Sequence, residues 1–291
     1  MIVPPPTDKR FAACLCLLLA GLAGVPATAQ FQAGVDLVEV YATVTDTQGN
    51  PIRGLTADDF GVSEDGVGQE VSAFAEGEVP LAVAVAVDHS FSVPRNQLTQ
   101  YAAAAQRFLK ALRPADEVMV IGVGSETATL SALSSSRGPA IAALDSLQPW
   151  GTTPLYDAVV EAVAGIDSAS GRRALVLLSD GVERYSEITG ANMIAEARRR
   201  NVLVYPVILG STASADLREV ARVTGGRFVS VRSAERLTAE LEGIATELRA
   251  QYLLGYSSKA MPLDVPTWRS IRVTVDRTGA VVRAREGYVA R

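Results

Sequence analysis

Oxygen-bearing side chains gather directly after one apolar stretch of the chain. Residues 81–87 are Leu, Val and Ala only, and Asp88, Ser90 and Ser92 follow at alternate positions. A hard divalent cation such as Mg²⁺ takes about six oxygen ligands, and carboxylates, hydroxyls and retained water suit it better than nitrogen or sulfur. The types and spacing of these residues therefore predict a divalent-metal site.

Two further oxygen-bearing side chains stand at comparable places in the sequence. Asp180 follows the apolar stretch 174–178, and Thr153 lies just before an expected helix. Ligands of open α/β sheets bind beyond the carboxyl ends of the strands, so we expect three separate segments to deliver oxygens to one edge of a sheet. We predict Mg²⁺ as the bound ion, with Mn²⁺ or Ca²⁺ as alternatives. The predicted metal ligands are Asp88, Ser90, Ser92, Thr153 and Asp180.

Some residues of this region also have ordinary structural explanations. Ser92 could cap the helix that follows it, because serine is a preferred N-cap residue. Thr152 is adjacent to Thr153, so the ligand assignment could shift by one position. Phe91 and Trp150 are candidate contact aromatics, but either ring could instead pack against its own loop.

From residue 80 onward, apolar strands alternate with segments of helical length, and these must position the oxygens. This alternation is typical of a mostly parallel sheet covered by helices on both faces, so we predict a doubly wound α/β fold. The expected strands are 81–87, 117–123, 127–133, 174–178 and 202–208. The expected helices are 95–112, 139–147, 155–166, 191–200, 215–223 and 234–248.

Shorter stretches with a strand-like pattern flank this region on both sides. They lie at 35–45, 60–64 and 70–74 before it and at 251–256, 269–276 and 281–285 after it. Neither flank has enough strands for a stable sheet of its own, so we expect the two to pair into a small β domain. The predicted organisation is a signal peptide at 1–29, an N-terminal β segment at 30–77, an α/β domain at 78–248 and a C-terminal β segment at 249–291.

The N-terminus has the pattern of a cleavable secretory signal peptide. Lys9 and Arg10 precede the apolar run 11–25, and a small-x-small site ends at Ala29. We therefore expect export to the periplasm, the cell surface or the medium. An uncleaved membrane anchor is the weaker alternative, because the run is shorter than the roughly 20 apolar residues of a spanning helix. After cleavage of the signal peptide no membrane span is expected. The chain's 2 cysteines lie inside the run, which leaves no thiol in the mature protein.

The composition is that of a globular protein without a basic surface. The 291 residues are 48% hydrophobic and 20% charged, with a formal net charge of -5. A chain of this length and hydrophobic content can bury a sizeable core. No basic run stands out, so neither nucleic acid nor anionic lipid is an expected partner.

The order of the five predicted ligands resembles the metal-ion-dependent adhesion site of von Willebrand factor type A domains. The similarity covers about residues 80–248, and the flanking motifs at 54–60, 251–256 and 284–288 resemble bacterial exported proteins with a VWFA-related domain. The resemblance implies a protein-binding or adhesion module, not an enzyme. In such a module the metal captures an Asp or Glu carboxylate of a partner protein.

Two other functions remain as alternatives. Phosphatases of the haloacid-dehalogenase type also place an Asp at the end of a first strand, but they need a second Asp two residues later, where this chain has Ser90. A structural surface protein with a degenerate metal site is the other alternative. It is suggested by Phe91, which stands where the resembled family usually has a small residue.

Overall fold

The centre of the α/β region is a six-stranded sheet. The computed structural model describes residues 37–77, 79–210, 214–259 and 265–290, so the predicted signal peptide lies outside the described residues. The strand order is β10-β9-β8-β5-β6-β7. All neighbours are parallel except β7, which is antiparallel to β6. The strands are β5 (Leu81–Asp88), β6 (Glu117–Val123), β7 (Thr127–Ser134), β8 (Arg172–Ser179), β9 (Leu203–Leu209) and β10 (Val229–Val231).

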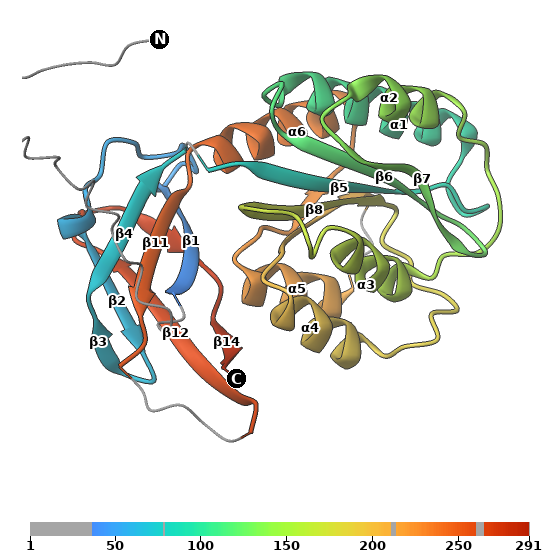
Figure 1. Ribbon diagram of the computed structural model, residues 1–291. Helices are drawn as coiled ribbons and strands as arrows, with labels where there is room; N and C mark the ends of the chain where they lie inside the picture. Colours follow the sequence, from blue (N-terminus) through green and yellow to red (C-terminus); the bar gives the residue numbers. More distant parts are fainter. Residues whose placement is uncertain (1–36, 78, 211–213, 260–264, 291) are drawn as a thin grey trace, which may run out of the picture. The chain divides into compact units, whose positions relative to one another are not determined.

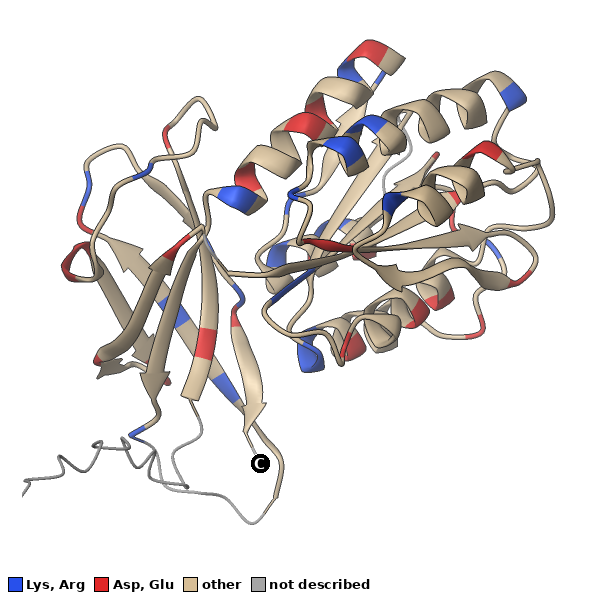
Figure 2. Cartoon of the chain, turned by 45° about the horizontal axis from the view of Figure 1, so that its top comes forward, with Lys and Arg blue, Asp and Glu red and all other residues tan. Residues whose placement is uncertain are grey.

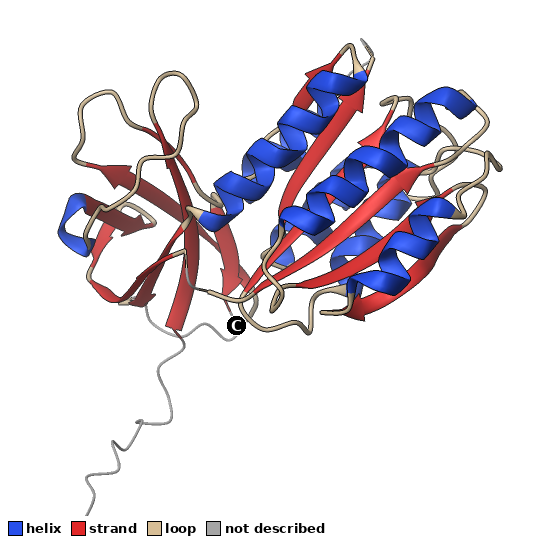
Figure 3. Cartoon of the chain, turned by 90° about the horizontal axis from the view of Figure 1, so that it is seen from above, coloured by secondary structure: helices blue, strands red, loops and turns tan. Residues whose placement is uncertain are grey.

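Helices cover both faces of this sheet (Figure 1), and the view from above in Figure 3 shows those of the near face lying along the strands. One face carries α1 (Arg95–Ala111), α2 (Arg137–Asp145) and α6 (Ala234–Arg249). The other carries α3 (Leu155–Gly165), α4 (Gly190–Arg199) and α5 (Ala215–Thr224). Within the described ranges, no helix is long and apolar enough to cross a membrane.

The central strand β5 shows why this sequence forms a sheet with two covered faces. All of its residues are buried. Alternate side chains of a strand point to opposite faces, and accordingly Val83, Val85 and Val87 join the core under α1 and α6, whereas Ala84 and Ala86 join the core under α3. Figure 2 shows the charged residues mainly on helices and turns, with the central strands almost free of them.

The two flanks pair with each other into antiparallel sheets. In one sheet the order is β13-β1-β11-β4, and in the other it is β14-β12-β2-β3. Each sheet therefore mixes strands that come before and after the α/β region in the sequence. The strands are β1 (Leu37–Thr45), β2 (Phe60–Glu64), β3 (Val67–Gln69), β4 (Val71–Glu76), β11 (Tyr252–Ser257), β12 (Thr267–Val275), β13 (Val281–Arg283) and β14 (Gly287–Ala290), with the short 3₁₀ helix η1 (Ala57–Asp59) before β2.

The predicted fold class is confirmed, with local differences. The helix expected at 139–147 is α2, which begins two residues earlier and holds Pro139 in its first turn, where proline lacks no hydrogen bond. The strand β10 was not predicted, because three residues are too short to show a periodic pattern. The division of the chain at residues 78 and 249 stays a prediction.

Arg172, the first residue of β8, is buried beside the segments that lead into and out of the α/β region. The described residues form one compact unit. Within it the guanidinium donates to the carbonyl oxygen of Leu248, to that of Val79 at 2.9 Å and to that of Gly77 at 3.4 Å. A single cation on β8 thus bonds to the backbone of two other segments that are far apart in sequence.

Candidate metal centre

Asp88 ends β5 at the carboxyl edge of the sheet, and its side chain is fully buried. Ser90 donates to Asp88 Oδ1 twice, from its backbone nitrogen at 3.0 Å and from its hydroxyl at 2.6 Å. Such an Asp side chain bonded to the backbone two residues later is a common way to turn a chain at the end of a strand. The turn brings the Ser90 hydroxyl back beside the carboxylate.

Three hydroxyl groups from two loops converge next to Asp88. The Thr153 hydroxyl donates to Ser90 Oγ at 2.8 Å. Ser92 Oγ lies 3.0 Å from Ser90 Oγ and 3.5 Å from Thr153 Oγ1. Ser90 and Thr153 are buried, while Ser92 is exposed, so the triangle of oxygens reaches the surface at Ser92.

The third loop begins at Asp180, directly after Ser179, the last residue of β8. Ser179, which the sequence reasoning did not single out, donates its hydroxyl to Asp88 Oδ2 at 2.7 Å. Asp180 is half-buried, and its Oδ1 accepts from the backbone nitrogen of Val182 at 3.0 Å. Across the described residues, no hydrogen bond joins Asp180 to the other four predicted ligands. Its charge nevertheless acts on Asp88.

The environment of Asp88 disfavours its charged form. Burial raises the pKa of Asp88 to about 6, the hydrogen bonds from Ser90 and Ser179 oppose that rise, and the negative charge of Asp180 adds to it. A carboxylate that is buried beside a second carboxylate, with only hydroxyls and one backbone N–H to stabilise it, is suited to a cation.

The hydroxyls of Ser92 and Thr153 are not used to cap helices. The N-cap of α1 is Pro94, without a side-chain cap. At the start of α3, the backbone nitrogen of Tyr156 is bonded by Glu183 Oε2 at 3.1 Å and Ser186 Oγ at 3.0 Å, not by Thr153. Both hydroxyls are therefore left for the cluster.

Backbone hydrogen bonds fix the loops relative to one another. The Phe91 nitrogen donates to the Gly151 carbonyl at 3.0 Å, and the Trp150 nitrogen donates to the His89 carbonyl at 2.7 Å. Gly151 has a φ of 81°, and a Cβ there would lie 2.1 Å from a backbone nitrogen, so only glycine fits. The Arg184 nitrogen donates to the Thr153 carbonyl at 2.9 Å, which ties in the third loop.

Each of the three loops also exposes one aromatic side chain. Phe91 is 72% exposed, Trp150 48% and Tyr185 74%. Tyr185 has a φ of 72°, a left-handed conformation that costs a bulky side chain free energy. Phe91 and Trp150 were expected as candidate contact aromatics, whereas no sequence signal marks Tyr185.

The oxygen spacing can be compared with that around a cation. Ligands about 2.1 Å from Mg²⁺ in octahedral geometry lie about 3.0 Å from their neighbours, and the longer Ca²⁺ distances spread them to about 3.4 Å or more. The three hydroxyl spacings of 2.8 Å, 3.0 Å and 3.5 Å span both values, and the two shorter ones are also ordinary hydrogen-bond distances. Among the described residues there is no cluster of three or more His, Cys, Asp and Glu side chains, and the predicted set instead combines two carboxylates with three hydroxyls.

Comparisons with known proteins agree with this fold. Residues 83–183 match the sequence profile of the von Willebrand factor type A domain. A von Willebrand factor type A structure from Catenulispora acidiphila is similar over 89% of this chain and 75% of that one, with 13% identity and a TM-score of 0.56. No curated protein matches the chain.

Two further similar structures come from other kinds of protein. Proximal thread matrix protein 1 from the mussel byssus aligns with 64% of this chain and 51% of its own, at 14% identity and a TM-score of 0.51. A mutant of the PilB minor pilin from Streptococcus sanguinis aligns with 60% of this chain and 62% of its own, at 15% identity and a TM-score of 0.50. At these identities the likeness establishes the fold.

The covered sheet, with its loops at the carboxyl edge, has the von Willebrand factor type A fold. The chain contains a von Willebrand factor type A domain, and the profile match ends just after Asp180.

Proposed function

We propose that this chain is an exported protein-binding or adhesion module that uses a divalent cation, Mg²⁺ in the first place, to capture an Asp or Glu carboxylate of a partner protein. Asp88, Ser90, Ser92, Thr153 and Asp180 hold the metal. The observation that carries the proposal is the triangle of Ser90, Ser92 and Thr153 hydroxyls beside the buried Asp88. Two of the similar structures are by name a minor pilin and a byssus thread matrix protein, which supports a protein-binding role.

Three of the five proposed ligands are neutral hydroxyls, and this favours binding of an anion from a partner protein. Two carboxylates only balance the charge of a dication, and hydroxyls add none. When bound, the metal would supply a Lewis-acidic coordination position at the surface. Ser92, the exposed member of the triangle, marks the side from which a partner's carboxylate would approach.

The exposed aromatics around this position favour an acidic residue with apolar neighbours. Phe91, Trp150 and Tyr185 come from the three loops that also carry the proposed ligands. Solvent-exposed rings on a surface that already attracts a carboxylate are the kind of side chain that contributes most to binding energy. We therefore propose a partner segment in which Asp or Glu is flanked by apolar side chains.

Peptide binding tests this function. With Mg²⁺ present, calorimetric titration with an acetylated, amidated Leu-Asp-Leu peptide is expected to give a dissociation constant in the millimolar range, and binding is lost in EDTA or with Leu-Asn-Leu. Thr153→Val, which removes one hydroxyl at equal volume, is expected to abolish binding. Phe91→Ala is expected to weaken it about five-fold, close to 1 kcal/mol of lost apolar contact.

Leu130→Ala is the matched control, because Leu130 is a large exposed apolar residue on β7, outside the three loops. Equal binding of the Asp and Asn peptides would overturn carboxylate capture. Equal effects of Phe91→Ala and Leu130→Ala would remove the aromatic contribution while leaving metal capture in place. Metal-dependent turnover of a generic phosphoester, lost in Thr153→Val, would instead favour the phosphatase alternative.

Export is expected to be visible at the N-terminus of the mature protein. If residues 1–29 are a signal peptide, the protein recovered outside the cytoplasm begins at Gln30. Mass spectrometry of the intact secreted chain measures this directly. A chain that retained its first residues in the cytoplasmic fraction would contradict the proposed location.

A further inference from the structure

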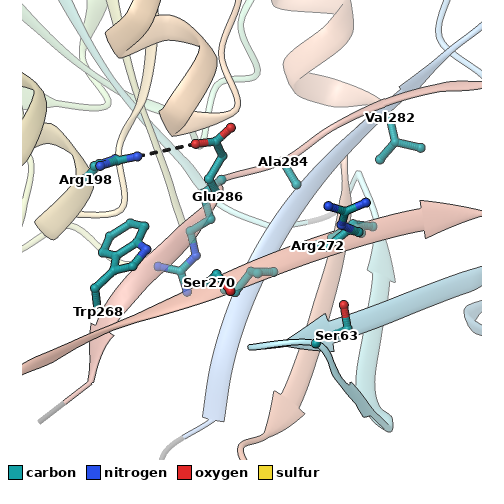
Figure 4. A pocket seen from close by; sticks show the side chains of 12 residues that line it. Ser63, Arg198, Trp268, Ser270, Arg272, Val282, Ala284 and Glu286 are labelled. Atoms are coloured by element: carbon teal, nitrogen blue, oxygen red, sulfur yellow. Dashed lines mark hydrogen bonds and ion pairs between the residues drawn. The ribbon is translucent and has the colours of Figure 1, made fainter.

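A second candidate site lies in the β sheets, apart from the metal centre. It is a groove with a volume of about 740 Å³, formed by β12, β2, the segment that leads from β13 to β14, and one residue of α4. Figure 4 shows Arg198 and Trp268 at one end of the groove and Arg272 and Ser63 toward the other. Pockets of several hundred cubic ångströms are of the size that holds small-molecule ligands.

The groove carries more positive than negative charge. Three arginines line it, Arg198, Arg272 and Arg285, together with one carboxylate, that of Glu286. Glu286 is shared between two guanidinium groups, because Arg198 Nη2 lies 3.4 Å from its Oε2 and Arg222 bonds its Oε1. Within the described part of the chain the exposed Arg272 has no ion pair. The groove therefore has an excess of positive charge although the protein as a whole has a net charge of -5.

Two donors of these arginines lack an acceptor. In the part of the chain that the structure describes, the buried Nε atoms of Arg198 and Arg285 make no hydrogen bond. Arg285 donates from Nη2 to the Glu39 carbonyl at 2.6 Å, and burial lowers the pKa of its guanidinium to about 10. Arg285 is half-buried and has no ion pair among the described residues, so a bound anion would offset the cost of desolvating its charge.

Trp268 adds a flat apolar surface beside these cations. It is 37% exposed, and the Arg198 guanidinium lies 4.7 Å from its ring centroid. A Cβ on Gly287 would come within 2.5 Å of the ring, so glycine at that position lets the indole lie against the backbone. Ser63, on the far side, is half-buried and offers a hydroxyl.

We propose that this groove binds an oxyanion, a carboxylate or a sulfate, carried on a small ring of sugar size. Arg272 and Arg285 hold the charged group, and the exposed edge of Trp268 contacts the ring. The site does not depend on the metal centre, since none of its lining residues lies in the loops that carry the proposed metal ligands.

Tryptophan fluorescence tests the proposal. The chain has 2 tryptophans, so Trp150→Phe serves as a background in which the signal comes from Trp268 alone. At constant ionic strength, after metal has been removed with EDTA and the EDTA itself by dialysis, sodium glucuronate or sodium sulfate is expected to give a saturable change with a millimolar dissociation constant. Glucose, which has no charge, is expected to give none. Saturation by glucuronate alone assigns the ligand as a carboxylate, and tighter saturation by sulfate assigns it as a sulfate.

Arg272→Ala in the same background is expected to weaken anion binding at least five-fold. Arg277→Ala is the matched control: it removes the same charge from an exposed residue in the turn after β12, outside the groove. The proposal is overturned by the absence of a saturable change with either anion, by an equal response to glucose, or by equal effects of Arg272→Ala and Arg277→Ala. Because the protein is metal-free throughout, failure here leaves the metal-dependent function untouched.

Discussion

Asp88→Asn is expected to raise the melting temperature of the metal-free protein and to abolish its stabilisation by Mg²⁺. Asp88 is fully buried, and burial raises its pKa from 3.8 to about 6. Each pKa unit corresponds to about 1.4 kcal/mol, so holding the charge at neutral pH costs roughly 3 kcal/mol at most. Asparagine removes the charge but keeps one oxygen acceptor for Ser90 or Ser179. We expect a net gain of about 1 kcal/mol, or roughly 2–4 °C.

With Mg²⁺ the order of stability should reverse. The metal offsets the charge of the wild-type carboxylate, and a ligand at 100 times its dissociation constant stabilises the folded state by about 2.7 kcal/mol. The variant lacks the anionic ligand and should melt at the same temperature with and without Mg²⁺. Differential scanning calorimetry of both proteins in EDTA and in Mg²⁺ measures the reversal.

The pH dependence of stability is a second test of Asp88→Asn. The pKa of Asp88 is raised by folding, so the metal-free wild type loses stability as pH rises from 3.8 to about 6. The advantage of Asp88→Asn should therefore be absent below pH 4 and complete above pH 6. Asp145→Asn, the same change at an exposed residue of α2, should alter neither the melting temperature of the metal-free protein nor its increase with Mg²⁺. If Asp88→Asn still melted at a higher temperature with Mg²⁺ than without it, Asp88 would not be a metal ligand.

The parts of this fold that could be predicted are those in which one short segment carries its own pattern. β5 is apolar throughout because both of its faces are covered, and that run is readable without any knowledge of its neighbours. Asp88, Ser90 and Ser92 lie on one turn, so their alternate spacing already placed them together. Thr153 needed only the expectation that its loop reaches the same sheet edge, and its hydroxyl lies 2.8 Å from Ser90 Oγ.

The parts that could not be predicted depend on contacts between distant segments. The position of Ser179, next to Asp180 at a strand end, could have marked it as a candidate. Its hydrogen bond to Asp88, however, joins β8 to β5 and depends on how these two strands pair. Tyr185 becomes a candidate contact residue only once its backbone conformation and exposure are known. The groove beside Trp268 combines strands from both flanks with Arg198 of α4, and no stretch of sequence contains more than a part of it.

Arg172→Met is expected to lower the free energy of unfolding by about 3 kcal/mol. Arg172 is 2% exposed and donates to the carbonyl oxygens of Leu248, Val79 and Gly77. Hydrogen bonds from a charged donor contribute about 1.5–3 kcal/mol each, and a buried carbonyl left without a partner costs about 1–3 kcal/mol. Part of this loss is offset, because burial also disfavours the guanidinium charge and lowers its pKa. Methionine fills a similar space, which keeps the cavity small.

Urea denaturation followed by circular dichroism measures the change, with Arg107→Met as the control. Arg107 is exposed on α1, and the same substitution there should shift stability by less than about 0.5 kcal/mol. The three carbonyls belong to the segments that enter and leave the α/β region. Loss of their hydrogen bonds to Arg172 should therefore loosen the attachment of the flanking strands to β8 and lower the urea concentration at the midpoint of unfolding. If Arg172→Met unfolded at the same urea concentration as Arg107→Met, the hydrogen bonds would give no net stabilisation. Apolar packing alone would then hold these segments together.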